Sequence, residues 1–94
     1  MSEKRYWTPD RPMPDLTVGE RRELIELVRG KVERNRLTYV WLIARLTEQG
    51  VRLDKYEMSA ILGAVRLGAK ANEVLRRSAD ILSDYERLMC VNTG

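Results

Sequence analysis

After residue 16, apolar residues recur at intervals of three and four, and no stretch alternates apolar and polar residues over the length of a strand. This is the periodicity of amphipathic α-helices, so the pattern predicts an all-α fold. We expect a bundle of four to five helices, of which the four main ones span residues 17–35, 37–50, 54–63 and 72–89. Their apolar stripes predict a core made of Leu24, Val28, Leu42, Ile43, Leu46, Met58, Ile61, Leu62, Leu75, Ala79 and Leu82.

Polar residues at the predicted helix starts fit known capping patterns. Thr17 and Glu20 are spaced as a capping box, in which each side chain bonds to the backbone N–H of the other residue. Asp54 and Glu57 have the same spacing, and Thr38 is a good N-cap for the second helix. These residues predict where the first three helices begin.

Glycine and proline divide the chain further. Gly50 ends the second helix, because glycine adopts the left-handed conformation that stops a helix at no steric cost, and Gly63 ends or loosens the third. Residues 1–16 contain all three prolines and are typical of an extended arm. Residues 17–90 then form a single helical domain, and residues 91–94 form a tail that frays.

Composition excludes several classes of chemistry. The chain has no histidine and a single cysteine, Cys90, which removes the usual zinc ligands, the Ser-His-Asp and Cys-His nucleophiles and any internal disulfide. The two glycine-rich phosphate-binding motifs, GxxxxGK(S/T) and GxGxxG, are both absent from the sequence. No apolar run reaches the roughly 18 residues of a membrane span. We therefore expect that the protein is not an enzyme and that it has no cofactor, metal or membrane contact. We also expect it to be located in the reducing cytoplasm.

Charge indicates the class of partner. The chain has 17 basic and 14 acidic residues, a formal net charge of +3. This modest excess favours anionic partners, and it lies between residues 17 and 70. The middle of the chain is therefore where a partner surface is expected.

Residues 37–70 combine a short apolar helix, a break at glycine, a second short helix with a polar outward face and a basic turn. This arrangement resembles the helix-turn-helix of the Cro/C1 phage-repressor family, the XRE-like group, and is similar to a group of small phage-encoded proteins. The resemblance to the Cro/C1 family is carried by Leu37, Thr38, Leu42, Ile43, Leu46, Gly50, Val51, Asp54, Ser59 and Ile61. The similarity to the phage-encoded group is carried by Trp41, Leu42, Ile43, Leu46, Gly50, Asp54, Lys55, Glu57, Met58, Ser59, Arg66, Gly68, Lys70 and Ala71.

The resemblance implies a lambda-repressor-like domain over residues 17–90. It also implies a sequence-specific transcriptional regulator, repressor-like and of phage or mobile-element type, that binds double-stranded DNA as a homodimer. The chain departs from the family pattern at two places. Thr47, Glu48 and Gln49 separate Leu46 from its glycine, and Ala64 stands where the family often has glycine.

The helix that starts at Asp54 has the residues that a base-reading helix needs. Such a helix presents donors and acceptors outward from its first turns while its inward side is anchored in the core. Lys55, Tyr56, Ser59 and Ala60 occupy the outward positions and are predicted to contact bases. Lysine can reach guanine, the two hydroxyls can donate or accept, and the alanine methyl can meet a thymine methyl.

Phosphate contacts are predicted on either side of this helix. Arg66 and Lys70 lie in the basic turn that follows it, and the backbone at the cap Thr38 can meet a phosphate at the start of the preceding helix. Such contacts position a protein on DNA without specifying sequence.

Other interpretations remain open at this point. The same helices could belong to a small phage protein that binds and inhibits a host protein without DNA, or to an architectural, excisionase-like DNA binder. Lys4, Arg5, Tyr6 and Trp7 could enter a minor groove, although we favour packing of the two aromatic rings onto the core. Trp41 is expected in the core.

The last helix predicts a further contact. Its final turns carry Tyr85, Leu88 and Met89, which the predicted core cannot cover completely. Either the arm or a second subunit would cover them, and we favour the second subunit, as in a two-fold dimer on a palindromic site.

Overall fold

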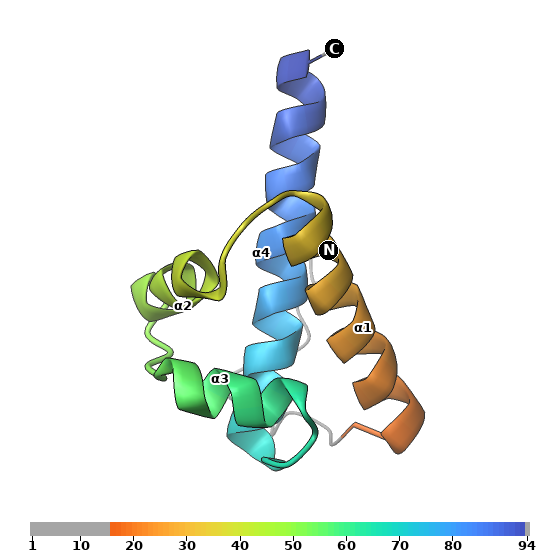
Figure 1. Cartoon of the computed structure of the whole chain (residues 1–94), viewed down its shortest axis with the longest axis vertical. Helices are drawn as coiled ribbons and strands as arrows, with labels where there is room; N and C mark the ends of the chain where they lie inside the picture. The colour runs from red at the N-terminus through yellow and green to blue at the C-terminus, as the bar shows by residue number, and fades with distance from the viewer. Residues whose placement is uncertain (1–15, 94) are drawn as a thin grey trace, which may run out of the picture.

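Four helices make up most of the structure, a computed structural model that describes residues 16–93. They are α1 (Val18–Arg34), α2 (Tyr39–Glu48), α3 (Lys55–Leu62) and α4 (Ala69–Thr93), as Figure 1 shows. No strand occurs within this described range, so the predicted all-α bundle is confirmed. The predictions for Lys4 to Trp7 and for most of the arm fall outside the described residues.

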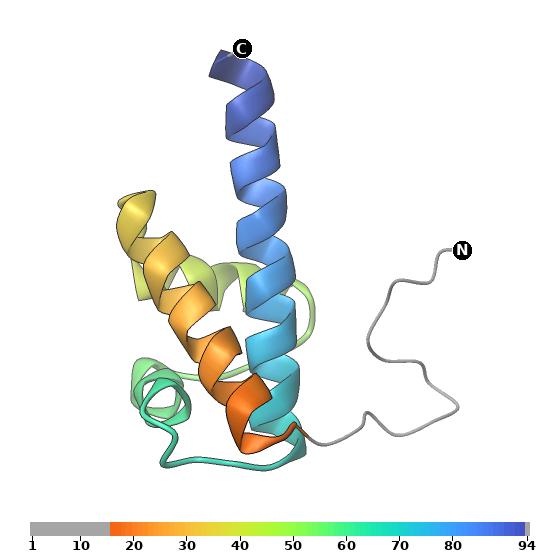
Figure 2. The ribbon, with the colours of Figure 1, turned by 90° about the vertical axis from the view of Figure 1, so that its right-hand side faces the viewer.

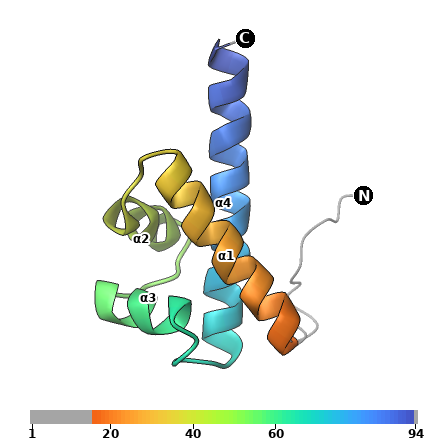
Figure 3. The same cartoon turned by 45° about the vertical axis from the view of Figure 1, so that its right-hand side comes forward.

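The two long helices, α1 and α4, pack against each other and form the body of the bundle (Figure 3). α2 and α3 lie together on one side of this pair, and α2 contacts both α3 and α4 (Figure 1). The last turns of α4 extend past the other helices (Figure 2). The α2–α3 unit is thus held against a rigid support and leaves its other side open.

The core forms where the four apolar stripes meet. Of the predicted core residues, only Leu24 and Ile43 are partly exposed, and both still pack against the buried cluster. The structure adds six buried apolar residues to the predicted core: Leu16, Ile25, Val32, Val51, Ala71 and Val74. The inward faces of all four helices therefore agree with the sequence pattern.

Helices α1, α2 and α3 each begin directly after their predicted capping residue. The Glu20 backbone N–H donates to Thr17 Oγ1 at 3.1 Å and Thr17 N–H donates to Glu20 Oε1 at 3.0 Å, which confirms the capping box of α1. At α2, Thr38 Oγ1 accepts from the N–H of Trp41 at 3.1 Å. At α3, Asp54 accepts from the N–H of Glu57 at 2.8 Å.

Gly50 ends α2 as predicted. Its φ is 91°, in the left-handed region, and its N–H donates to the Thr47 carbonyl at 2.9 Å. The next residue, Val51, donates to the Leu46 carbonyl at 2.9 Å, which completes a Schellman motif. Val51 is also buried, so the turn is attached to the core.

Two other helices end in the same motif without glycine at the left-handed position. Arg36 follows α1 with φ 58°, and Ala64 follows α3 with φ 60°. Gly63, predicted as the stop of α3, has φ −88° and only precedes the left-handed residue. A side chain in this conformation costs about 1–2 kcal/mol, so both turns are held by the packing around them.

α4 is longer than residues 72–89, the range that the sequence predicts. It begins at Ala69 because Gly68, with φ 114°, turns the chain there, and Asn72 N–H donates to the Gly68 carbonyl at 3.0 Å. It continues to Thr93 because no glycine or proline follows until Gly94. Even so, no helix in the described part of the chain is both long and apolar enough to cross a membrane.

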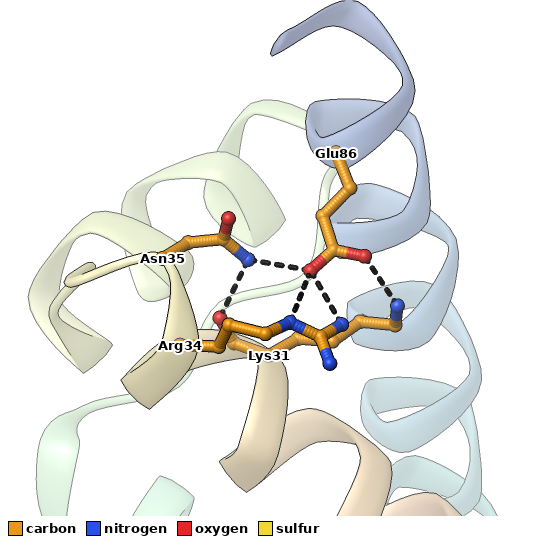
Figure 4. Close-up of polar contacts among 4 residues, drawn as sticks. All are labelled: Lys31, Arg34, Asn35 and Glu86. Carbon is orange, nitrogen blue, oxygen red and sulfur yellow. Dashed lines mark hydrogen bonds and ion pairs between the residues drawn. The ribbon is translucent and has the colours of Figure 1, made fainter. Parts of the chain in front are cut away.

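The far half of α4 is tied to the end of α1 by Glu86 (Figure 4). Its Oε1 lies 2.5 Å from Lys31 Nζ, and its Oε2 lies 2.7 Å from both Arg34 Nη2 and Asn35 Nδ2. These three donors lower the pKa of Glu86 from 4.5 to about 2, with the Lys31 hydrogen bond as the largest cause. The cluster therefore links the last turn of α1 to α4 beyond their apolar contact.

Candidate nucleic-acid interface

The outward side of α3 is polar and open. Lys55, Tyr56 and Ser59 are exposed, and the exposed fraction of Tyr56 is 78%. Ala60 is partly buried, since the turn after α3 folds against it and both Val65 and Arg66 donate backbone N–H groups to its carbonyl. Three of the four predicted base-contacting residues are therefore exposed to solvent.

Lys55 has a charge that no neighbour neutralises. Within residues 16–93 its ammonium group forms no ion pair or hydrogen bond. It lies at the first position of α3, one residue after the cap Asp54. A cation in this position is available to an anionic or carbonyl-bearing partner.

The N-terminal turn of α2 lies beside α3. Tyr39 and Val40 of that turn line one hollow together with Lys55 and Ser59 of α3. The cap Thr38 is exposed just before this turn, and its hydroxyl is occupied by the Trp41 N–H. Thr38 is therefore near the outward face of α3 as predicted, but a phosphate would meet the backbone of this turn rather than the threonine hydroxyl.

α1 contributes a second cation to this hollow. Arg29 lines it, and Arg29 Nη1 donates to the Leu62 carbonyl at the end of α3, at 3.3 Å. Burial raises the pKa of Tyr39 above 10.0, against the opposing effect of the Arg29 charge. The Tyr39 hydroxyl thus stays protonated and can donate a hydrogen bond.

Arg66 and Lys70 lie on the other flank of α3, around Glu57. Lys70 Nζ lies 3.2 Å from Glu57 Oε2 and 2.6 Å from the carbonyl oxygen of Arg52. Arg66 Nη1 lies 3.5 Å from the same Glu57 oxygen. One carboxylate therefore neutralises part of the charge that was assigned to phosphates.

This arrangement corrects one detail of the sequence reasoning. Glu57 was predicted to reach back to Asp54 as the second half of a capping box, but its carboxylate bonds Lys70 and Arg66 instead. Glu57 bonds Lys70, 13 residues further along the chain, because the ammonium group is a charged donor and the Asp54 backbone N–H is a neutral one.

Three residues of this surface were missed from the sequence: Arg29, Tyr39 and Glu57. Arg29 looks like an ordinary exposed residue of α1, and only the packing of α1 against the end of α3 brings it beside Lys55. Tyr39 does carry a signal, because it directly follows the cap Thr38 and so had to lie on the first turn of α2.

Trp41 lies away from this surface. It is partly buried and packs against the core, as predicted. Its ring meets the ring of Tyr85 from α4 edge to face, with centroids 5.4 Å apart, and the Arg45 guanidinium lies 5.9 Å from its centroid. Tyr85 is therefore partly covered by α2, whereas Leu88 and Met89 in the last turns of α4 are 64% and 41% exposed.

Comparisons with protein-family models, with curated proteins and with solved structures gave no match to this chain. Nor do the described residues contain a group of three or more side chains that could hold a metal ion.

Proposed function

We propose that the protein is a sequence-specific, double-stranded DNA-binding regulator of the repressor type. The observation that carries the proposal is the outward side of α3, where the unpaired Lys55 stands with two exposed hydroxyl side chains beside the first turn of α2. A short helix that is anchored on one side and polar on the other fits the width of the major groove.

Each exposed side chain has a role in this proposal. Lys55 donates to the acceptors of guanine, and Tyr56 and Ser59 donate to or accept from base edges. Ala60 is partly covered, so it contributes at most an apolar contact to a thymine methyl. Base recognition is accordingly assigned first to Lys55, Tyr56 and Ser59.

Positioning groups stand on both flanks of these side chains. The first turn of α2, after Thr38, offers backbone N–H groups on one flank, and Arg66 and Lys70 offer charge on the other. Two flanking anchors are what a helix in the major groove requires, because a phosphate backbone borders the groove on each side.

We further propose that the regulator acts as a homodimer through the projecting turns of α4. Leu88 is 64% exposed there, and the end of α4 extends past α1 and α2 (Figure 1). An exposed leucine on a helix that extends past its own bundle favours contact with a second copy. A two-fold pair would present two α3 helices to successive turns of DNA.

A second candidate function has its own support. Val65 and Leu67, in the turn between α3 and α4, are 80% and 56% exposed. Two exposed apolar residues beside the polar face favour a protein partner, as expected for a small phage protein that inhibits a host protein. The dependence of binding affinity on salt concentration distinguishes the two functions. The affinity for DNA falls steeply as salt increases, whereas the affinity of an apolar protein contact does not.

The proposal is tested by measuring the affinity of three variants for a duplex selected by the unmodified protein. Lys55→Ala should cost about 1–3 kcal/mol and relax sequence preference at one position. Arg66→Ala should weaken all sequences alike and reduce the salt slope by about one unit. Arg22→Ala is the control, because Arg22 is exposed on α1, outside both the α2–α3 surface and the projecting turns of α4. Equal affinities for all three variants would overturn the proposal.

A further inference from the structure

A hollow of about 290 Å³ lies between α1, α2 and α3. Its volume is close to the lower end of the range for small-molecule sites, about 300 Å³. Three helices that are separate in sequence contribute to it, so it exists only in the folded bundle. Its position beside Lys55 and Ser59 gives it a direct connection to the proposed DNA surface.

Four of the seven residues that line the hollow are polar, and two of these four are cationic. Arg29 and Lys55 supply positive charge, and Tyr39 and Ser59 supply hydroxyl groups. The guanidinium of Arg29 donates to the Leu62 carbonyl, its one hydrogen bond to the described residues, and since Arg29 is exposed its other N–H groups are open to solvent or a ligand. An anion that can accept from several donors fits a lining with this composition.

The rest of the lining is apolar. Met58 and Leu62 are buried core residues of α3 that form part of the wall, and Val40 lies at the rim. A bare phosphate or chloride ion would leave this apolar wall uncovered. A ligand that matches both parts carries an anionic group on a compact apolar body, about the size of one aromatic ring.

We propose that the hollow binds a small organic carboxylate with a ring-sized apolar body, and that the bound carboxylate competes with DNA for Lys55. The carboxylate meets Arg29 and Lys55 and accepts from the hydroxyls of Tyr39 and Ser59, while the ring covers Met58 and Leu62. The competition rests on the proposed function. The binding itself does not, because it needs only the free protein.

The test uses phenylacetate as the probe and phenylacetamide, its uncharged counterpart, as the matched control. Each is titrated into the full-length, nitrogen-15-labelled protein, and the backbone amide shifts are followed. Phenylacetate should shift the amides of Tyr39, Lys55 and Ser59, and phenylacetamide should bind at least about tenfold more weakly. Equal binding of the two compounds, or no shift at these residues with phenylacetate, would overturn the proposal.

Two variants locate the site. Arg29→Gln should weaken phenylacetate binding about tenfold, whereas Arg66→Gln, on the other flank of α3, should leave it unchanged. Arg29 is exposed, so the variant is expected to fold, and its circular dichroism spectrum checks this. Equal loss in both variants would contradict the site and indicate general attraction of anions.

The competition has a separate measurement. Phenylacetate at saturation should weaken binding to the selected duplex at constant ionic strength, and phenylacetamide at the same concentration should not. If phenylacetate leaves the duplex affinity unchanged while it shifts the hollow residues, the competition is wrong and the binding site stands. If the protein alone binds no duplex, the proposed function fails independently of the amide shifts.

Discussion

Glu57 and Lys70 form an ion pair, 3.2 Å between Oε2 and Nζ, that closes one flank of α3. Glu57 comes two positions after Lys55, so it lies about 200° round the helix from it. The charge of Lys70 is therefore partly neutralised on this flank, whereas the charge of Lys55 is not. The same carboxylate also takes up Arg66, so a single residue limits the attraction of this whole flank for phosphate.

Removal of that carboxylate should strengthen DNA binding. We expect Glu57→Gln to bind every duplex more tightly and to show a steeper dependence on salt, by up to about one unit of slope, because Lys70 and Arg66 become free for phosphates. Fluorescence anisotropy at several salt concentrations measures both effects. Glu48→Gln is the matched control, since Glu48 is also paired with an arginine, Arg45, but at the far end of α2. Weaker binding by Glu57→Gln would contradict this role for the carboxylate.

Substitution by glycine should stabilise the protein where a non-glycine residue has a left-handed backbone conformation. Ala64→Gly removes the steric cost of φ 60° and should raise the free energy of unfolding by up to about 1 kcal/mol. Gly50→Ala introduces the same strain and should lower it by about 1–2 kcal/mol. Urea denaturation measures both. Destabilisation by Ala64→Gly would mean that the Ala64 methyl makes a contact worth more than the strain.

The Glu86 cluster should make stability depend on acid. Its folded pKa of about 2 lies below the ordinary value of 4.5, so the ionised carboxylate stabilises the folded state. That stabilisation is present in full above pH 4.5 and is lost as the pH falls toward about 2. Glu86→Gln should be less stable than the unmodified protein at pH 7, and the difference should shrink on acidification. A difference that stays constant with pH would exclude an electrostatic origin.

The Trp41 and Tyr85 rings should be energetically coupled. Trp41→Ala should lower the free energy of unfolding by about 2–4 kcal/mol. This is somewhat less than the loss for a fully buried ring, because the indole is only partly buried. A double-mutant cycle with Tyr85→Ala should give a coupling of about 0.5–1.5 kcal/mol. Tyr56→Ala is the control and should change stability by less than about 0.5 kcal/mol, because Tyr56 is 78% exposed. A coupling of zero would mean that the edge-to-face contact contributes nothing.

The helices and their inward faces could be predicted because each depends on residues close in sequence. Three- and four-residue spacing is enough to select Val28, Leu46, Met58 and Leu82 as core, and local caps are enough to predict the starts of α1, α2 and α3. The start of α4, predicted at Asn72 or just before it, lies at Ala69, because Gly68 turns the chain there and glycine more often signals a helix end.

The candidate site could be predicted only in part, because some of its contacts join residues that are distant in sequence. The outward positions of α3 follow from helical periodicity, so Lys55, Tyr56 and Ser59 were found. The contact of Glu57 with Lys70 and the approach of Arg29 to α3 depend on tertiary packing, which no local pattern encodes. Those contacts decide which cations are free, so the pairing of Arg66 and Lys70 could be seen only in the structure.

The central claim is that the outward side of α3 reads DNA sequence, and selection from a random duplex pool tests it most directly. The unmodified protein and Lys55→Ala are each used to select duplexes at low salt, and the enriched sequences are compared. The account predicts one enriched motif with two related half-sites for the unmodified protein, and loss of preference at one position in each half-site for Lys55→Ala. A pool that emerges unenriched from selection with the unmodified protein would contradict it.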